Sequence, residues 1–165
     1  MNKILFKFLI IFLLCFSGSL FFLRTDFAQL FLKSPTAILQ TTIITKCLEN
    51  IIDISCVGTT LYGSRYSILI NNECTPFYSI ALFISATIAF PCAISKKIKT
   101  IFLISILIFL LSLFRISAIY VTGVYFTKYV DVMHDQIAQN ISLILLSLFW
   151  LYWINSRDRG KRAEV

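Results

Sequence analysis

Four apolar runs dominate this chain of 165 residues. Each is close to the roughly 20 residues that a helix needs to cross about 30 Å of hydrocarbon. Charged residues make up only 14% of the chain, where a soluble domain has about 25%. The composition predicts an integral membrane protein, so the net charge of +7 is not a sign of nucleic-acid binding. The expected spans cover residues 4–23, 76–95, 100–120 and 137–154.

The first run also fits a signal peptide, because Lys3 and Lys7 give it a basic start. However, the small residues Ser17, Gly18 and Ser19 are followed by further apolar residues rather than by a polar mature sequence. We therefore interpret this run as an uncleaved membrane anchor.

Basic residues predict the orientation, because cytoplasmic loops of membrane proteins are enriched in lysine and arginine. The chain concentrates them before the first run, between the second and third, and after the fourth. We expect both termini inside a bacterial plasma (inner) membrane, and one domain over residues 1–165. The basic residues assigned to the inner side are Lys3, Lys7, Lys96, Lys97, Lys99, Arg157, Arg159, Lys161 and Arg162.

The outer segment between the first two runs has its own pattern. Apolar residues recur at helical spacing over residues 36–54, which predicts an amphipathic helix, with Pro35 suited to its first turn. Residues 57–70 combine β-branched and aromatic residues with glycines, which predicts a short β-hairpin. The expected fold class is an all-α integral membrane protein with four transmembrane helices, an extracytoplasmic amphipathic helix and a short hairpin.

Cys74 stands in the stretch "NNECTPFYSI", at the expected outer end of the second span. A helix N-terminus lowers the pKa of a nearby thiol and favours the reactive thiolate, whereas the neighbouring Glu73 acts in the opposite direction. Cys74 is therefore a candidate nucleophile. The alternative is an inert small residue at a span boundary.

Two further polar residues are expected at the same outer face. Arg115 interrupts the third span, where an arginine usually faces an interior site, although it can also extend to the headgroups. His134 precedes the fourth span and is otherwise a solvated surface residue. A thiol, an imidazole and a guanidinium are the groups that cysteine acyl transfer requires. Asp131 and Asp135 are candidates to orient the imidazole, and we favour Asp135 as an N-cap of the fourth helix.

The other cysteines show no metal-ligand spacing, and we expect neither a metal nor another cofactor. Cys15 and Cys92 lie within apolar runs, where a free thiol packs as a small apolar group. Cys47 and Cys56 can form a disulfide in an oxidising compartment, but nothing in the sequence requires one.

The chain resembles the exosortase/archaeosortase family of membrane cysteine transpeptidases. The similarity rests on "ECT" at residues 73–75, "FRI" at residues 114–116 and the loop around His134, in the family's order of Cys, Arg and His. It implies Cys74 as nucleophile with Arg115 and His134 as its catalytic partners. The chain departs from the family at Pro76, where many members have a small residue, and at Ser112, where many have asparagine.

The resemblance implies a protease or transpeptidase that cleaves the C-terminal sorting signal of secreted proteins near the outer membrane surface. The implied partners are substrates ending in a short motif, a transmembrane helix and a basic tail, together with membrane lipid. The competing interpretation is a non-catalytic subunit or assembly factor for export of surface polysaccharide or protein. A small transporter fits less well, because Arg115 is the only charged residue inside the last three runs.

Overall fold

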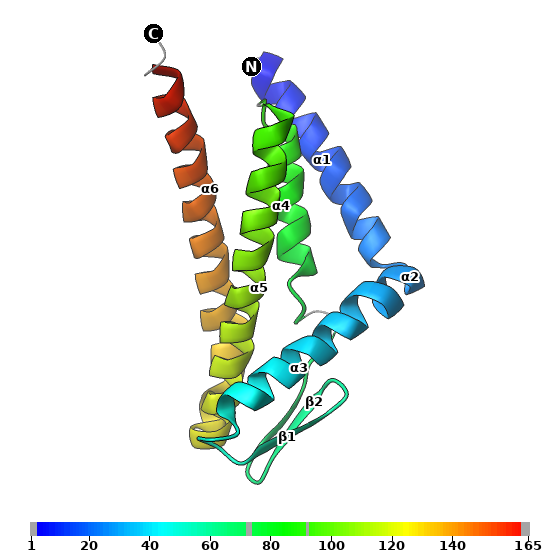
Figure 1. Cartoon of the computed structure of the whole chain (residues 1–165), viewed down its shortest axis with the longest axis vertical. Coiled ribbons are helices and arrows are strands. Elements are labelled where there is room, and N and C mark those ends of the chain that lie inside the picture. The colour runs from blue at the N-terminus through cyan, green and yellow to red at the C-terminus, as the bar shows by residue number, and fades with distance from the viewer. Residues whose placement is uncertain (1–2, 72–73, 92, 163–165) are drawn as a thin grey trace.

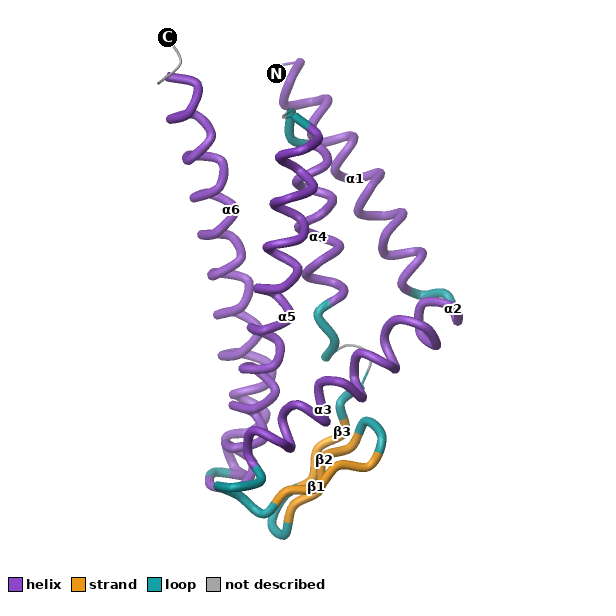
Figure 2. The backbone as a smooth tube through the Cα atoms, in the orientation of Figure 1, coloured by secondary structure: helices purple, strands orange, loops and turns teal. Residues whose placement is uncertain are grey.

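The structure, a computed structural model, describes residues 3–71, 74–91 and 93–162. Its long helices run roughly side by side, and both chain ends lie at the same end of the molecule (Figure 1). At the opposite end lie a tilted helix and a small sheet, and Figure 2 shows the strands of this sheet in orange. The principal helices are α1 (Lys3–Leu23), α3 (Ser34–Leu48), α4 (Phe77–Ala89), α5 (Ile94–Tyr125) and α6 (Gln139–Arg162).

Three helical segments of the described chain are long and apolar enough to cross a membrane: Leu5–Leu23, Ile94–Tyr125 and Val132–Asn155. The helices that hold these segments cover the expected first, third and fourth spans, so a mostly helical protein with three helices able to cross a membrane is confirmed. The third helix is longer than expected, with 32 residues rather than the 21 of the run at 100–120.

The expected second span is wrong in its length. Residues 76–95 do not form one helix, because α4 has 13 residues and ends at Ala89. Pro91 explains this end: a residue before proline avoids the α-helical region, and Phe90 is extended with φ −74° and ψ 131°. At 1.5 Å per residue α4 is about 20 Å long, shorter than the hydrocarbon layer.

The helix expected over residues 36–54 begins earlier and ends earlier than predicted. A helical path starts at α2 (Asp26–Ala28), capped by the Thr25 hydroxyl, which accepts from the Ala28 N–H at 3.3 Å. It continues through η1 (Gln29–Lys33), a π-helical turn, into α3. Pro35 stands in the first turn of α3, as predicted.

The segment after α3 is a three-stranded antiparallel sheet rather than a lone hairpin. Its strands are β1 (Ile54–Val57), β2 (Thr60–Gly63) and β3 (Ser67–Leu69), paired in sequence order. Gly58 makes the first turn with a φ of 62°, a left-handed conformation that suits glycine. The alternating burial of β1 begins at Ile54, so the end of the predicted amphipathic helix is a strand.

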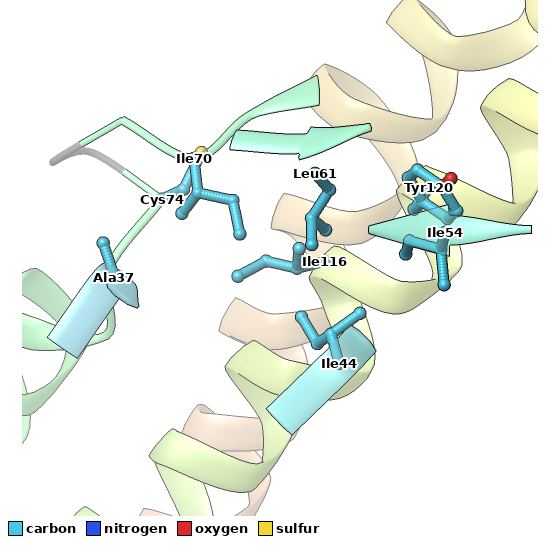
Figure 3. Close-up of a cluster of buried hydrophobic side chains, with 8 residues drawn as sticks. All are labelled: Ala37, Ile44, Ile54, Leu61, Ile70, Cys74, Ile116 and Tyr120. Carbon is cyan, nitrogen blue, oxygen red and sulfur yellow. The ribbon is translucent and has the colours of Figure 1, made fainter. Parts of the chain in front are cut away.

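The sheet and α3 are joined to α5 by one apolar cluster, shown in Figure 3. Ile44 of α3, Leu61 of β2 and Ile116 of α5 are fully buried at its centre. A second cluster joins α4, α5 and α6 through Phe83, Ile104, Ile108 and Leu146. Because α5 belongs to both clusters, it fixes the sheet end of the molecule relative to the long helices.

Two tyrosines and two glycines also fix the sheet on α5. A Cβ placed at Gly63 of β2 would overlap the Tyr120 hydroxyl, and one placed at Gly123 of α5 would overlap the Tyr66 ring. The two rings lie 6.4 Å apart, centroid to centroid. Each side of the contact therefore needs a glycine opposite a tyrosine.

We expect Gly123→Ala to lower the free energy of unfolding of the protein in detergent by about 1–2 kcal/mol. Alanine favours a helix over glycine by roughly 0.5–1 kcal/mol, but overlap with a packed ring costs about 1–3 kcal/mol. Gly18→Ala in α1 is the matched control, since nothing lies within 4 Å of its added Cβ. Thermal melting of both variants provides the measurement, and equal melting temperatures would contradict this account of the sheet contact.

Candidate active site

Cys74 lies just outside α4 rather than in its first turn, because the N-cap of α4 is Pro76. Its side chain is 9% exposed. The Cys74 N–H donates to both the carbonyl and the side-chain oxygen of Asn71, each at 3.1 Å. The Cys74 carbonyl accepts from the Ser112 hydroxyl of α5 at 3.3 Å. Both backbone polar groups of the cysteine are thus held in place.

Ser112 is itself held by α3. Gln40 donates from Nε2 to the Ser112 hydroxyl at 2.9 Å, and the Gln40 side chain is completely buried. The result is a chain of hydrogen bonds from α3 through α5 to Cys74. This chain couples the tilted helix to the position of the thiol.

His134 faces the thiol from the other side. It lies in η3 (Val132–Ala138), a π-helical segment leading into α6, and its Nε2 atom is 3.9 Å from Cys74 Sγ. Such a contact is long for a hydrogen bond to sulfur, but catalytic hydrogen bonds are often loose before substrate binds. With its proton on Nδ1, the ring presents the Nε2 lone pair to the thiol.

Arg115 reaches the same place from α5, one turn after Ser112. Its side chain is half-buried, and its Nε–H has no hydrogen-bond partner among the residues that the structure describes. A buried donor left unpaired costs about 1–3 kcal/mol. An oxygen atom supplied by a ligand would satisfy it.

These three residues line one cavity of about 540 Å³, which we call the polar cavity. Its polar lining also includes Arg24 from the α1–α2 turn and Tyr78 from α4. A volume of this size is typical of small-molecule and peptide sites. The structure therefore brings together Cys74, Arg115 and His134, which are up to 60 residues apart in the chain.

The two candidate aspartates are placed differently from the prediction. Asp135 lies inside η3, after the helical path has begun, so the interpretation as an N-cap is wrong; its side chain is outside the described residues. Asp131 is exposed. The pKa of Tyr66 is raised by burial and, to a smaller extent, by the charge of Asp131. Asp131 thus lies close enough to the sheet to affect a tyrosine there.

The other three cysteines that the structure describes lie outside the polar cavity. Cys15, Cys47 and Cys56 are free thiols, so the disulfide left open by the sequence does not form in this structure. Cys92 is outside the described residues. Within the described part of the chain, no group of three or more histidine, cysteine or acidic side chains is placed to hold a metal ion.

Sequence reasoning missed the residues that position the cysteine. Gln40 was not singled out from the sequence, and Ser112 was considered only as a departure from the family that the chain resembles. The available signal was spacing: Ser112 lies one turn before Arg115 and therefore on the same face of α5. Only the fold shows that Gln40 reaches it.

Comparison of the chain with protein-family models, with curated proteins and with solved structures finds no match. The chemistry of the site is therefore argued from its own geometry.

Proposed function

We propose that this chain is a membrane cysteine protease or transpeptidase of the exosortase type. It cleaves the C-terminal sorting signal of secreted proteins and then transfers the product to an amine or releases it with water. The observation that carries the proposal is the convergence on Cys74: an imidazole nitrogen 3.9 Å from its sulfur, and a guanidinium with an unpaired buried N–H in the same cavity.

In the first half of the reaction, His134 Nε2 takes the proton of the Cys74 thiol. The thiolate attacks the scissile carbonyl carbon, and the carbonyl oxygen becomes an oxyanion that the Arg115 guanidinium stabilises. When the carbon–nitrogen bond breaks, the leaving amine takes the proton from the His134 imidazolium. A thioester between Cys74 and the substrate remains.

In the second half, an acceptor amine or water gives a proton to His134 as it attacks the thioester carbonyl. The carbon–sulfur bond breaks, and the Cys74 thiolate recovers the proton from the imidazolium. The Cys74 backbone donates to Asn71 and accepts from Ser112, and these bonds keep the cysteine in position through both halves. Positioning of this kind matters, because small displacements of a reacting atom lower the rate steeply.

The proposal places the protein in a bacterial plasma membrane, with both termini inside and Cys74 on the extracytoplasmic side. Two observations support this orientation. The start of α1 and the end of α6 lie at one end of the molecule, and α3 and the sheet lie at the other (Figure 1). The polar cavity is lined by Arg24, which follows α1, and by Cys74, which follows the sheet in the chain. The basic residues at 96, 97 and 99 follow α4 and belong to the same end as the termini. The short helix α4, followed by the extended Phe90, then makes one of four crossings.

We expect Arg115→Lys to reduce substrate conversion by about tenfold or more without loss of protein from the membrane. Lysine keeps the positive charge but lacks the planar set of donors that Arg115 Nε belongs to, so the oxyanion loses a directed contact. The assay is conversion of a co-expressed secreted protein, ending in motif, helix and basic tail, to its shorter form.

Lys99→Arg, at an exposed position in the first turns of α5, is the matched control and should convert normally. Wild-type conversion by Arg115→Lys would show that the guanidinium makes no directed contact. No conversion by the wild-type chain itself would favour a non-catalytic subunit of an export system.

A further inference from the structure

A second cationic group contacts the lining of the polar cavity through Tyr78, apart from the reacting residues. Lys33 at the end of η1 is only 2% exposed, and its Nζ donates to the Tyr78 hydroxyl at 3.1 Å. The same ammonium lies 4.7 Å from the centroid of the Tyr78 ring. These contacts with Tyr78 are the polar contacts of Lys33 within the described residues. A buried charge normally has a counter-ion, and this one has none there.

Tyr78 lines the polar cavity, so its hydrogen bond with Lys33 affects which donor the cavity offers. Because the ammonium occupies a lone pair of the phenolic oxygen, the O–H hydrogen is directed elsewhere and can donate to a group in the cavity. Arg24 lines the same cavity and is exposed at the α1–α2 turn. Arg24, Lys33 and Tyr78 therefore form a cationic group with donors for an anion, which we call the α1–α3 corner.

An apolar groove adjoins the polar cavity on the side of the long helices. It has a volume of about 420 Å³ and lies between α1, α4 and α6, lined by Phe8, Phe12, Phe83 and Trp150 among others. Leu82 and Leu143 line both the groove and the polar cavity, so the two spaces are neighbours. A ligand that fills both must be anionic at one end and apolar at the other.

The size of the groove decides between two amphiphilic ligands, a transmembrane helix and a lipid with an acyl chain. An α-helix with its side chains is 10–12 Å across, so 420 Å³ encloses roughly 4–5 Å of helix, about one turn. An acyl chain is only one methylene wide and can follow the groove along the helices. The groove therefore fits a lipid chain better than a transmembrane helix.

We propose that the α1–α3 corner binds the phosphate of a membrane phospholipid, with one acyl chain of that lipid in the apolar groove. The phosphate accepts from Arg24 and from the Tyr78 hydroxyl, and its charge compensates the buried ammonium of Lys33. The α1–α3 corner lines the same cavity as Cys74 but includes none of the reacting residues, and the proposal does not depend on the reaction proposed for Cys74.

The fluorescence of Trp150 tests the proposal, because this side chain lines the groove and the chain has only two tryptophans. The full chain carrying Trp153→Phe, purified in a non-ionic detergent, is titrated with phosphatidylglycerol brominated along its acyl chains. We expect saturable quenching of Trp150 at a low mole fraction of lipid. Brominated diacylglycerol has the same chains without the phosphate and should need about ten times more lipid for the same quenching.

Variants distinguish binding of the lipid at the α1–α3 corner from a general attraction of anionic lipid to the basic protein. Arg24→Gln and Tyr78→Phe should each raise the lipid concentration for half-quenching by about tenfold, and Lys33→Met should do the same while its apolar stem still packs. Lys96→Gln and Lys99→Gln, which remove exposed charges far from the cavity, should leave it unchanged. If Trp153→Phe or Lys33→Met fails to fold, Arg24→Gln and Tyr78→Phe are compared in a chain that keeps both tryptophans. Because Trp153 is buried, the change in quenching still reports on Trp150.

Three results would overturn the proposal. Equal quenching by brominated diacylglycerol would show that the phosphate contributes nothing. Unchanged quenching in Arg24→Gln and Tyr78→Phe would show that the corner does not hold it. Displacement of the lipid by excess inorganic phosphate would identify a site for free phosphate instead of a lipid.

Discussion

Replacing Cys74 with serine is expected to reduce conversion of a tailed secreted substrate by at least about a thousandfold, because loss of a nucleophile removes the covalent route. A serine hydroxyl is far less acidic than a thiol, and His134 is placed to activate a thiol. The substitution removes little packing, and the backbone hydrogen bonds to Asn71 and Ser112 do not involve the side chain of residue 74. Protein abundance in the membrane should therefore stay near that of the wild type.

Cys15→Ser, Cys47→Ser and Cys56→Ser are the matched controls, since each removes a free thiol outside the polar cavity. All three should convert the substrate at nearly the wild-type rate. Loss of conversion in these controls at normal abundance would mean that the assay reports thiol chemistry elsewhere in the protein. Normal conversion by Cys74→Ser would exclude Cys74 as the nucleophile.

Replacing His134 with alanine is expected to reduce conversion by about 10² to 10⁴-fold, the usual contribution of a general acid–base group. The imidazole both takes the thiol proton and returns it to the leaving amine, so its loss affects two proton transfers. The same conversion assay, with protein abundance followed in parallel, provides the measurement.

Lys128→Ala tests the neighbourhood of His134 without touching the site, because Lys128 is exposed in the short turn between α5 and η3. It should behave like the wild type. Wild-type conversion by His134→Ala at normal abundance would exclude a role for the imidazole in the reaction.

The long apolar helices could be predicted from the sequence because their signal is strong: uncharged runs of the length of a bilayer leave few alternatives. The error in the second span came from giving hydropathy more weight than backbone chemistry. Pro91 was visible in the sequence, and its effect on Phe90 ends α4 at Ala89 despite the apolar residues that follow. A local steric rule decided that boundary.

The outer segment was harder to predict, because its short elements gain their stability from contacts with distant residues. Three elements contribute to one cluster through Ile44, Leu61 and Ile116, and no local sequence pattern predicts this contact. The helical spacing over residues 36–54 was genuine as far as Leu48, but a turn follows and strand β1 begins at Ile54. Periodicity alone does not distinguish a helix from a strand in a short apolar run, and tertiary packing decides between them here.

The residues that meet in the candidate site were predictable, but those that support them were not. The predicted topology put Cys74, Arg115 and His134 at one face, and all three line one cavity in the structure. The hydrogen bonds from Gln40 through Ser112 to the Cys74 carbonyl depend on how α3 crosses α5. The crossing follows from the packing around Ile44 and Ile116, which the sequence does not specify by itself.

The most direct test of the account is the mass of the peptide that contains Cys74 during turnover. The wild-type protein is mixed with a tailed substrate, quenched in acid to preserve a thioester, digested and analysed by mass spectrometry. The account predicts that Cys74 carries the acyl group of the cleaved substrate and that hydroxylamine removes it. Cleaved substrate together with an unmodified Cys74, or with the acyl group on another residue, would contradict it.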